Sequence, residues 1–94
     1  MKIYRNRKAK NHPSIEVSND ISTWKNMVMT HQPAKKKRYI LLKHNPNADD
    51  ISKSYVEKRV RNDPIKTRGE LLKKYKLSVE DLNQIEEFLK NKKC

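Results

Sequence analysis

Glycine and cysteine are almost missing from this sequence, which has one of each in 94 residues. A single glycine, Gly69, excludes the glycine-rich phosphate loops of P-loop NTPases and dinucleotide-binding domains, and we expect no cofactor. A single cysteine, Cys94, excludes an intrachain disulfide, and a lone thiol is typical of a reducing compartment. We therefore expect a cytoplasmic protein.

Long apolar runs are also missing. The longest is Tyr39-Ile40-Leu41-Leu42, which is too short for a signal peptide or a membrane span. Only 34% of the residues are hydrophobic, so the core should be thin. The chain therefore predicts one small domain over residues 1–94, with no membrane partner.

Acidic residues are scarce: 11 Asp and Glu stand against 23 Lys and Arg, a net charge of +12. A surface that repels itself in this way favours an anionic partner, most commonly nucleic acid, whose condensed counterions are released on binding. Residues 1–48 hold 11 basic and 2 acidic residues, whereas residues 49–94 hold 12 and 9. The binding surface should thus lie mainly in the N-terminal half, and the choice between DNA and RNA stays open.

Two basic clusters are the candidate phosphate contacts. The first lies in residues 1–11, a short strand or a flexible basic arm. The second is expected in a hairpin loop, and the two would form one patch if the first strand lay beside the third. Trp24 and Tyr39 would offer rings for base stacking, although core packing is the favoured interpretation of both. The predicted nucleic-acid contacts are Arg5, Arg7, Lys8, Lys10, Lys35, Lys36, Lys37, Arg38, Trp24 and Tyr39.

Three strands are predicted in the first half of the chain. Residues 14–17 alternate apolar and polar side chains, residues 24–30 are rich in large and β-branched residues, and residues 38–43 contain the apolar run. Residues 49–62 fit a helix or a strand, with extended structure slightly favoured, until Asn62-Asp63-Pro64 interrupts either one.

Helices are predicted near the C-terminus. Thr67-Arg68-Gly69-Glu70 has the form of a capping box, and Ser78-Val79-Glu80-Asp81 resembles a second one. Leu82, Ile85 and Leu89 then form an apolar face at helical spacing. The predicted fold is α+β: a small N-terminal antiparallel sheet or partly open barrel of three to five strands, followed by a C-terminal helical pair. The carboxylates that open the second helix argue against a DNA-reading helix.

The three histidines suggest an enzymatic alternative. His12, His31 and His44 each lie at a predicted strand end or turn. Two histidines can share general acid and base duties in metal-independent RNA cleavage, with Lys43 or Arg38 stabilising the phosphorane. Counting the strands up and down puts His12 and His31 at one end of the sheet and His44 at the other. The candidate catalytic set is therefore His12, His31 and Lys43, and the histidine spacing does not suggest a metal site.

Four short motifs carry a resemblance to a known group. They are His12-Pro13-Ser14, Thr30-His31, Leu42 with Asn45-Pro46-Asn47, and Ser54-Tyr55. Their order resembles small lysine-rich proteins of Firmicutes that are often associated with mobile elements. This chain has Gln32 where that group often has Ser, and Tyr75 near a common tryptophan position. The resemblance implies a bacterial plasmid or phage context and draws attention to His12, His31 and Asn45, but implies no activity.

Three hypotheses follow from the sequence. The first is a small basic nucleic-acid-binding protein, and the second is a metal-independent endoribonuclease, such as the toxin of a toxin–antitoxin pair. The third is an adaptor that binds an acidic protein. The oligomeric state stays open.

Overall fold

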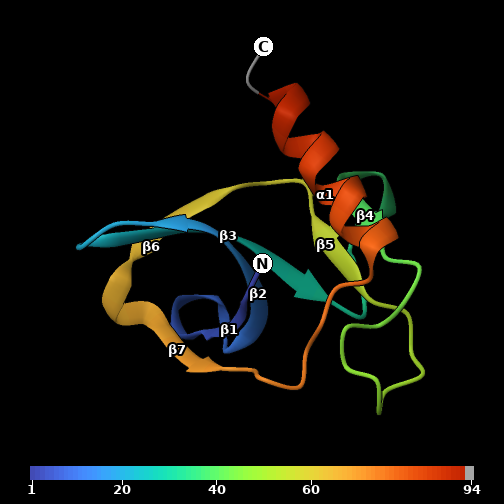
Figure 1. The fold of residues 1–94 in the computed structure, drawn as a ribbon, viewed down its shortest axis with the longest axis horizontal. Helices are drawn as coiled ribbons and strands as arrows, with labels where there is room; N and C mark the ends of the chain where they lie inside the picture. The colour runs from blue at the N-terminus through green and yellow to red at the C-terminus, as the bar shows by residue number, and fades with distance from the viewer. Residues whose placement is uncertain (93–94) are drawn as a thin grey trace.

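A computed structural model describes residues 1–92, so Cys94 lies outside the described residues. The fold is α+β, with seven strands followed by one C-terminal helix in the described chain (Figure 1). The elements, in order, are β1 (Ile3–Asn6), a 3-10 turn (Arg7–Ala9), β2 (His12–Asn19), β3 (Thr23–Thr30), a 3-10 turn (Lys36–Arg38), β4 (Tyr39–Leu41), β5 (Tyr55–Glu57), β6 (Arg61–Pro64), a 3-10 turn (Ile65–Thr67), β7 (Arg68–Leu71) and α1 (Val79–Lys92).

The strands form one open antiparallel sheet in the order β4-β5-β3-β2-β1-β7. Strand β3 is long enough to pair with two partners along one edge: Thr23–Asn26 pair with β6, and Met29–Thr30 pair with β5. The register puts Ile3 opposite Ile15 and Ile15 opposite Met27, which aligns three apolar side chains across the sheet. Directly paired residues on neighbouring strands point to the same face of a sheet, so these three side chains share one face.

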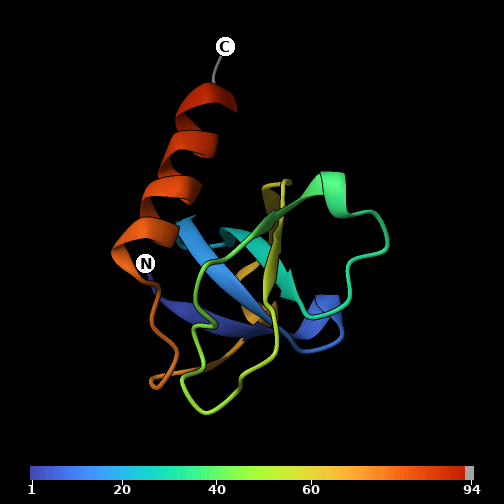
Figure 2. The ribbon, with the colours of Figure 1, turned by 90° about the vertical axis from the view of Figure 1, so that its right-hand side faces the viewer.

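That face is the core, and α1 closes it. Ile3, Ile15 and Met27 are buried there, together with Ile85 from the helix. Phe88 of α1 lines a hollow with Ile40 of β4, so the helix packs against the β4–β5 side of the sheet (Figures 1 and 2). Of the apolar face predicted for residues 82–89, Ile85 lies in the core, and Phe88 and Leu89 pack against it. Within residues 1–92, no helix is long and apolar enough to cross a membrane.

The predicted helical pair is wrong, because the first member is a strand. Residues 68–71 form β7, which pairs with β1. The Thr67 hydroxyl accepts a hydrogen bond from Trp24 Nε1 at 3.1 Å and donates one to the Pro64 carbonyl at 2.6 Å, so it does not cap a helix. The lone glycine lets β7 approach β1 closely, since a Cβ on Gly69 would lie 3.0 Å from the Arg5 carbonyl oxygen.

Other predicted elements agree better with the structure. The second capping box does begin a helix, where the Asp81 N–H donates to Ser78 Oγ at 3.2 Å. The extended structure favoured for residues 49–62 is present as β5 and the start of β6, but the predicted interruption at 62–64 is wrong because these residues belong to β6. Residues 3–9 form β1 and a 3-10 turn rather than a flexible arm.

Candidate nucleic-acid interface and histidine pocket

A cationic groove lies where the 3-10 turn of residues 36–38 meets the β5–β6 turn. The Lys58 N–H donates to the Arg38 carbonyl at 2.8 Å, which holds the two segments together. The hollow between them measures about 640 Å³. We call it the basic groove, and its cationic lining is Lys35, Lys37, Arg38, Lys58 and Arg59. Glu57 brings the one carboxylate of the lining, so positive charge dominates the groove.

Tyr39 forms part of the groove wall, whereas Trp24 does not reach the surface. The Tyr39 hydroxyl donates to Glu57 Oε2 at 3.3 Å. Burial and the Glu57 carboxylate raise the pKa of Tyr39, so the hydroxyl stays protonated. Trp24 is 0% exposed and packs edge-on against Tyr4, so its ring is not available to stack on a base. Of the two predicted stacking rings, only Tyr39 borders the groove.

The condition for a single basic patch is not met, because the strands next to the two basic clusters are not neighbours in the sheet. Strands β2, β3 and β5 lie between β1 and β4, so the first strand is not beside the third predicted one. Arg5 instead donates to the Asn11 carbonyl of its own hairpin, and Arg7 donates to the Lys66 carbonyl in the 3-10 turn before β7. The run 35–38 is not in a hairpin loop either, since β5 pairs with both β3 and β4.

A second concave site brings two histidines together. Strand β2 begins at His12 and β3 ends at Thr30, and the two strands are antiparallel neighbours. His12 and His31 therefore emerge at the same end of the sheet, and both line one small pocket with a volume of about 30 Å³. We call this the histidine pocket. Pro13 and Met29 give it apolar walls, and its polar lining is His12, Thr30, His31, Asn45, Ser54 and Tyr75.

The loop of residues 42–54 fixes the ring of His31. His31 Nδ1 lies 3.1 Å from the Lys53 carbonyl oxygen and 3.2 Å from Ser52 Oγ. The Ser52 hydroxyl donates in turn to Asp50 Oδ1 at 2.7 Å, and the other carboxylate oxygen lies 3.5 Å from His31 Nε2. Hydrogen bonds from the hydroxyl and N–H of Ser52, together with the His31 ring, lower the pKa of Asp50. The Asp50 carboxylate thus lies beside the His31 ring.

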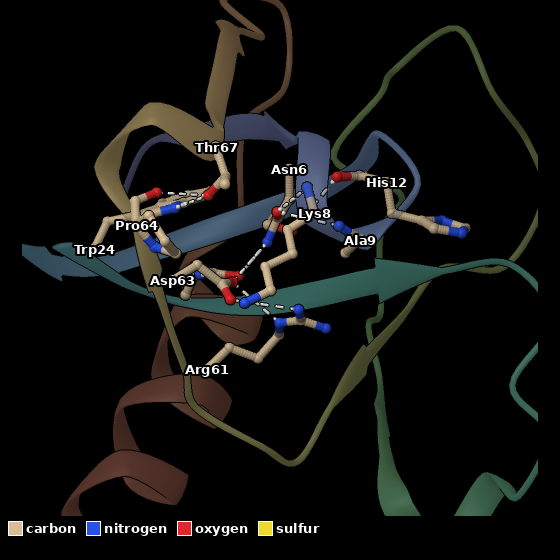
Figure 3. A network of polar contacts seen from close by, with 11 residues as sticks. Asn6, Lys8, Ala9, His12, Trp24, Arg61, Asp63, Pro64 and Thr67 are labelled. Atoms are coloured by element: carbon tan, nitrogen blue, oxygen red, sulfur yellow. Dashed lines mark hydrogen bonds and ion pairs between the residues drawn. The ribbon is translucent and has the colours of Figure 1, made fainter.

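The turn that leads to His12 is fixed by a buried asparagine. Asn6, which pairs with His12 across the β1–β2 hairpin, is 0% exposed. Its Oδ1 accepts from the N–H groups of Lys8 and Ala9, at 3.0 and 3.2 Å. Two residues of the turn, Lys10 and Asn11, have φ of 54° and 61°, an uncommon conformation for residues with a side chain. The His12 ring points away from this network (Figure 3).

The same asparagine joins a polar network that links three strands. Asn6 Nδ2 donates to Asn26 Oδ1 at 2.9 Å and to Asp63 Oδ2 at 3.1 Å. Asn26 Nδ2 and Arg61 Nε each donate to the same oxygen at 3.0 Å (Figure 3). Burial raises the pKa of Asp63, but the hydrogen bonds from Arg61, Asn26 and Asn6 outweigh burial and hold that pKa below its ordinary value. The hairpin that carries His12 is therefore anchored in the interior.

Lys43 and His44 lie outside the histidine pocket. The backbone N–H groups of both donate to the Asp81 carboxylate, at 2.7 and 3.1 Å. The His44 ring lies 3.6 Å from Glu80. Lys43 lines a separate hollow on the loop of residues 42–54, and Arg38 lines the basic groove. Neither cation predicted to stabilise a phosphorane borders the two histidines.

Several pocket residues were not predicted as site residues. Thr30, Ser54 and Tyr75 are hydroxyl-bearing residues of the lining, and Asn45, which the resemblance singled out, donates to the Ser52 carbonyl at 3.0 Å. A signal for them was present, because each of the four short motifs contributes at least one residue to this pocket. Lys58 and Arg59 of the basic groove were not predicted. Both lie in residues 49–94, where acidic residues nearly balance the basic ones.

Comparison with known proteins adds no functional assignment. No family model, curated protein or solved structure matches this chain. Within residues 1–92, no three His, Cys, Asp or Glu side chains gather as a metal site would require.

Proposed function

We propose that this protein binds nucleic acid through the basic groove. The observation that carries the proposal is the convergence of five cationic side chains, from two separate segments of the chain, on one hollow. Phosphate groups that enter such a groove release condensed counterions, which favours binding without any base contact. Tyr39 at the groove wall adds an aromatic surface next to the cations.

The basic groove suits the phosphate backbone of a nucleic acid more than a specific base sequence. Lys35, Lys37 and Lys58 are exposed and carry long flexible side chains, which act as point charges toward phosphates. The helix α1 is not arranged to read bases, because Asp81 at its start is buried against the loop at residues 43–44. Sequence-independent contacts to the phosphates are therefore the main interaction that we expect.

A pair of double variants tests this proposal. Lys58→Ala/Arg59→Ala should weaken binding to RNA and DNA oligonucleotides and reduce the slope of log affinity against log salt by roughly 1 for each phosphate that is no longer neutralised. Fluorescence anisotropy at several salt concentrations measures both. The matched control is Lys73→Ala/Lys74→Ala, which removes the same charge from an exposed segment outside the groove.

Equal weakening of binding in the two double variants would show that net charge, and not the groove, drives binding. Absence of binding by the wild-type protein at low salt would refute the proposal outright and leave an acidic protein as the candidate partner.

A further inference from the structure

The histidine pocket has room for one small group of a larger molecule. Its volume of about 30 Å³ is far below the ~300–1,000 Å³ of sites that enclose a drug-sized ligand. Most of its exposed surface is apolar, but six of the eight residues that line it carry polar side chains, two of them imidazoles, and such groups can hydrogen-bond a phosphate oxygen. A phosphodiester would therefore lie across the mouth of the pocket. The inference rests on the proposed function, since nucleic acid held by the protein would supply that phosphodiester.

The two histidines differ in their surroundings. The His12 ring has no hydrogen-bond partner among residues 1–92, so both of its nitrogens are open to a ligand. The His31 ring is held through Nδ1 by the Lys53 carbonyl, which requires a hydrogen on that nitrogen. Its Nε2 faces Asp50 at 3.5 Å, close enough for charge pairing but longer than a direct hydrogen bond. Nε2 is therefore the ring nitrogen of His31 that the loop leaves without a hydrogen bond, and a phosphodiester at the pocket would have to reach it beside Asp50.

We infer that the histidine pocket cleaves RNA without a metal, with His12 as general base and His31 as general acid. His12 takes the proton of a ribose 2′-hydroxyl, whose oxygen attacks the adjacent phosphorus. The bond from phosphorus to the 5′ oxygen of the next nucleotide breaks, and Nε2 of His31 gives its proton to that oxygen. The products are a 2′,3′-cyclic phosphate and a 5′-hydroxyl, with one proton gained by His12 and one lost by His31.

The hydroxyl groups of the pocket take the place of the predicted lysine. Thr30, Ser54 and Tyr75 line the same pocket as the two histidines. Hydroxyl donors fixed by the fold stabilise the charge that develops on the non-bridging phosphate oxygens. Ser54 is only 1% exposed, so the structure around it holds it in place. Asn45 holds the loop through the Ser52 carbonyl and so positions His31 indirectly.

The test is cleavage of a labelled single-stranded RNA in EDTA, beside the same sequence with 2′-O-methyl riboses. Wild-type protein should cut only the ribose substrate and leave a cyclic phosphate, with a bell-shaped dependence of rate on pH. His12→Ala and His31→Ala should each slow cleavage by roughly 10²- to 10⁴-fold. His44→Ala is the matched control, because His44 is an exposed histidine outside the pocket, and its rate should stay within about twofold of wild type.

Binding of the 2′-O-methyl RNA separates this inference from the proposed function. Wild-type protein that binds this RNA but does not cut the ribose substrate overturns the inference and leaves the binding proposal intact. Absence of binding overturns both. Cleavage of the 2′-O-methyl RNA, or normal cleavage by both histidine variants, also overturns the assignment. Thermal melts of the variants establish that they are folded, and His12→Gln and His31→Gln provide second substitutions of closer size.

Discussion

The carboxylate of Asp63 connects three strands of the sheet. It lies in β6, is 3% exposed, and accepts hydrogen bonds from Asn6 of β1 and Asn26 of β3. Arg61 adds a charged donor from the same strand. Because the side chains of Asn6, Asn26 and Asp63 are buried, the loss of any one of them leaves buried polar atoms with fewer partners. The network also holds the turn before His12 in place.

The lowered pKa of Asp63 makes the stability of the protein depend on pH. A depressed folded-state pKa contributes stability above the unfolded value of about 3.9, and this contribution is lost as pH falls through the folded value. Asp63→Asn should therefore flatten the loss of stability below about pH 4. At pH 7 it should lower the free energy of unfolding by about 1–3 kcal/mol. Urea denaturation across a pH series measures both effects.

The control for this prediction is Asp49→Asn, which removes an exposed carboxylate. It should change the free energy of unfolding by less than about 0.5 kcal/mol. The same acid sensitivity in wild type and Asp63→Asn would mean that other carboxylates determine the behaviour at low pH.

The role of a single residue was predictable only where its neighbours in the sequence determine that role. Ser78 precedes an amphipathic run and does cap α1. Thr67 has the same local pattern, but its hydroxyl is taken by Trp24, which lies 43 residues away. A capping pattern cannot reveal such a contact, since the competing partner comes from another strand. The burial of Trp24 follows from the same tertiary packing.

At the scale of elements, the two longest strands were the predictable part. Alternation located the middle of β2, and large and β-branched residues located most of β3. The pattern failed for β7, whose four residues include a glycine that packs against the backbone of β1. The sequence indicated a turn at residues 44–47, but not the conformation of the loop of residues 42–54, because contacts with α1 and with residues 75–76 hold it.

The contact between α1 and this loop should be essential to the structure of the loop. Asp81→Ala leaves the N–H groups of Lys43 and His44 without their acceptor, and it should lower the free energy of unfolding by about 1–3 kcal/mol. Hydrogen exchange at these two amides should accelerate beyond the change in global stability. Glu86→Ala, at an exposed position of the same helix, should stay within about 0.5 kcal/mol of wild type. Unchanged exchange at both amides would show that α1 does not organise the loop.

At the scale of the whole molecule, antiparallel topology accounts for the meeting of His12 and His31, as the strand count predicted. The same count was wrong for His44, because β5 pairs antiparallel with both β3 and β4, so that β4 runs parallel to β3 and ends at the same side of the sheet. Strands that alternate in direction return the chain to the same end after two crossings, and His12 and His31 line one pocket. The basic surfaces were not predictable in this way. Their arrangement depends on β5, which inserts between β3 and β4 and separates segments that would otherwise have formed one hairpin.

The net charge of +12 predicts how salt and polyanions act on stability. Self-repulsion lowers the stability of the folded state, and added salt screens it, so the melting temperature should rise between low and moderate salt. RNA at 100 times its dissociation constant should stabilise the folded protein by about 2.7 kcal/mol, which corresponds to a rise of roughly 10–20 °C for a domain of this size.

These two effects should oppose each other, because salt that screens the protein also weakens RNA binding. Differential scanning fluorimetry with and without a 2′-O-methyl RNA should show a large shift at low salt and almost none at high salt. Lys58→Ala/Arg59→Ala should reduce the shift at low salt, whereas Lys73→Ala/Lys74→Ala should preserve most of it. A shift of the same size at every salt concentration would mean that RNA binds mainly through uncharged groups. The lysine and arginine lining of the basic groove would then not explain the binding.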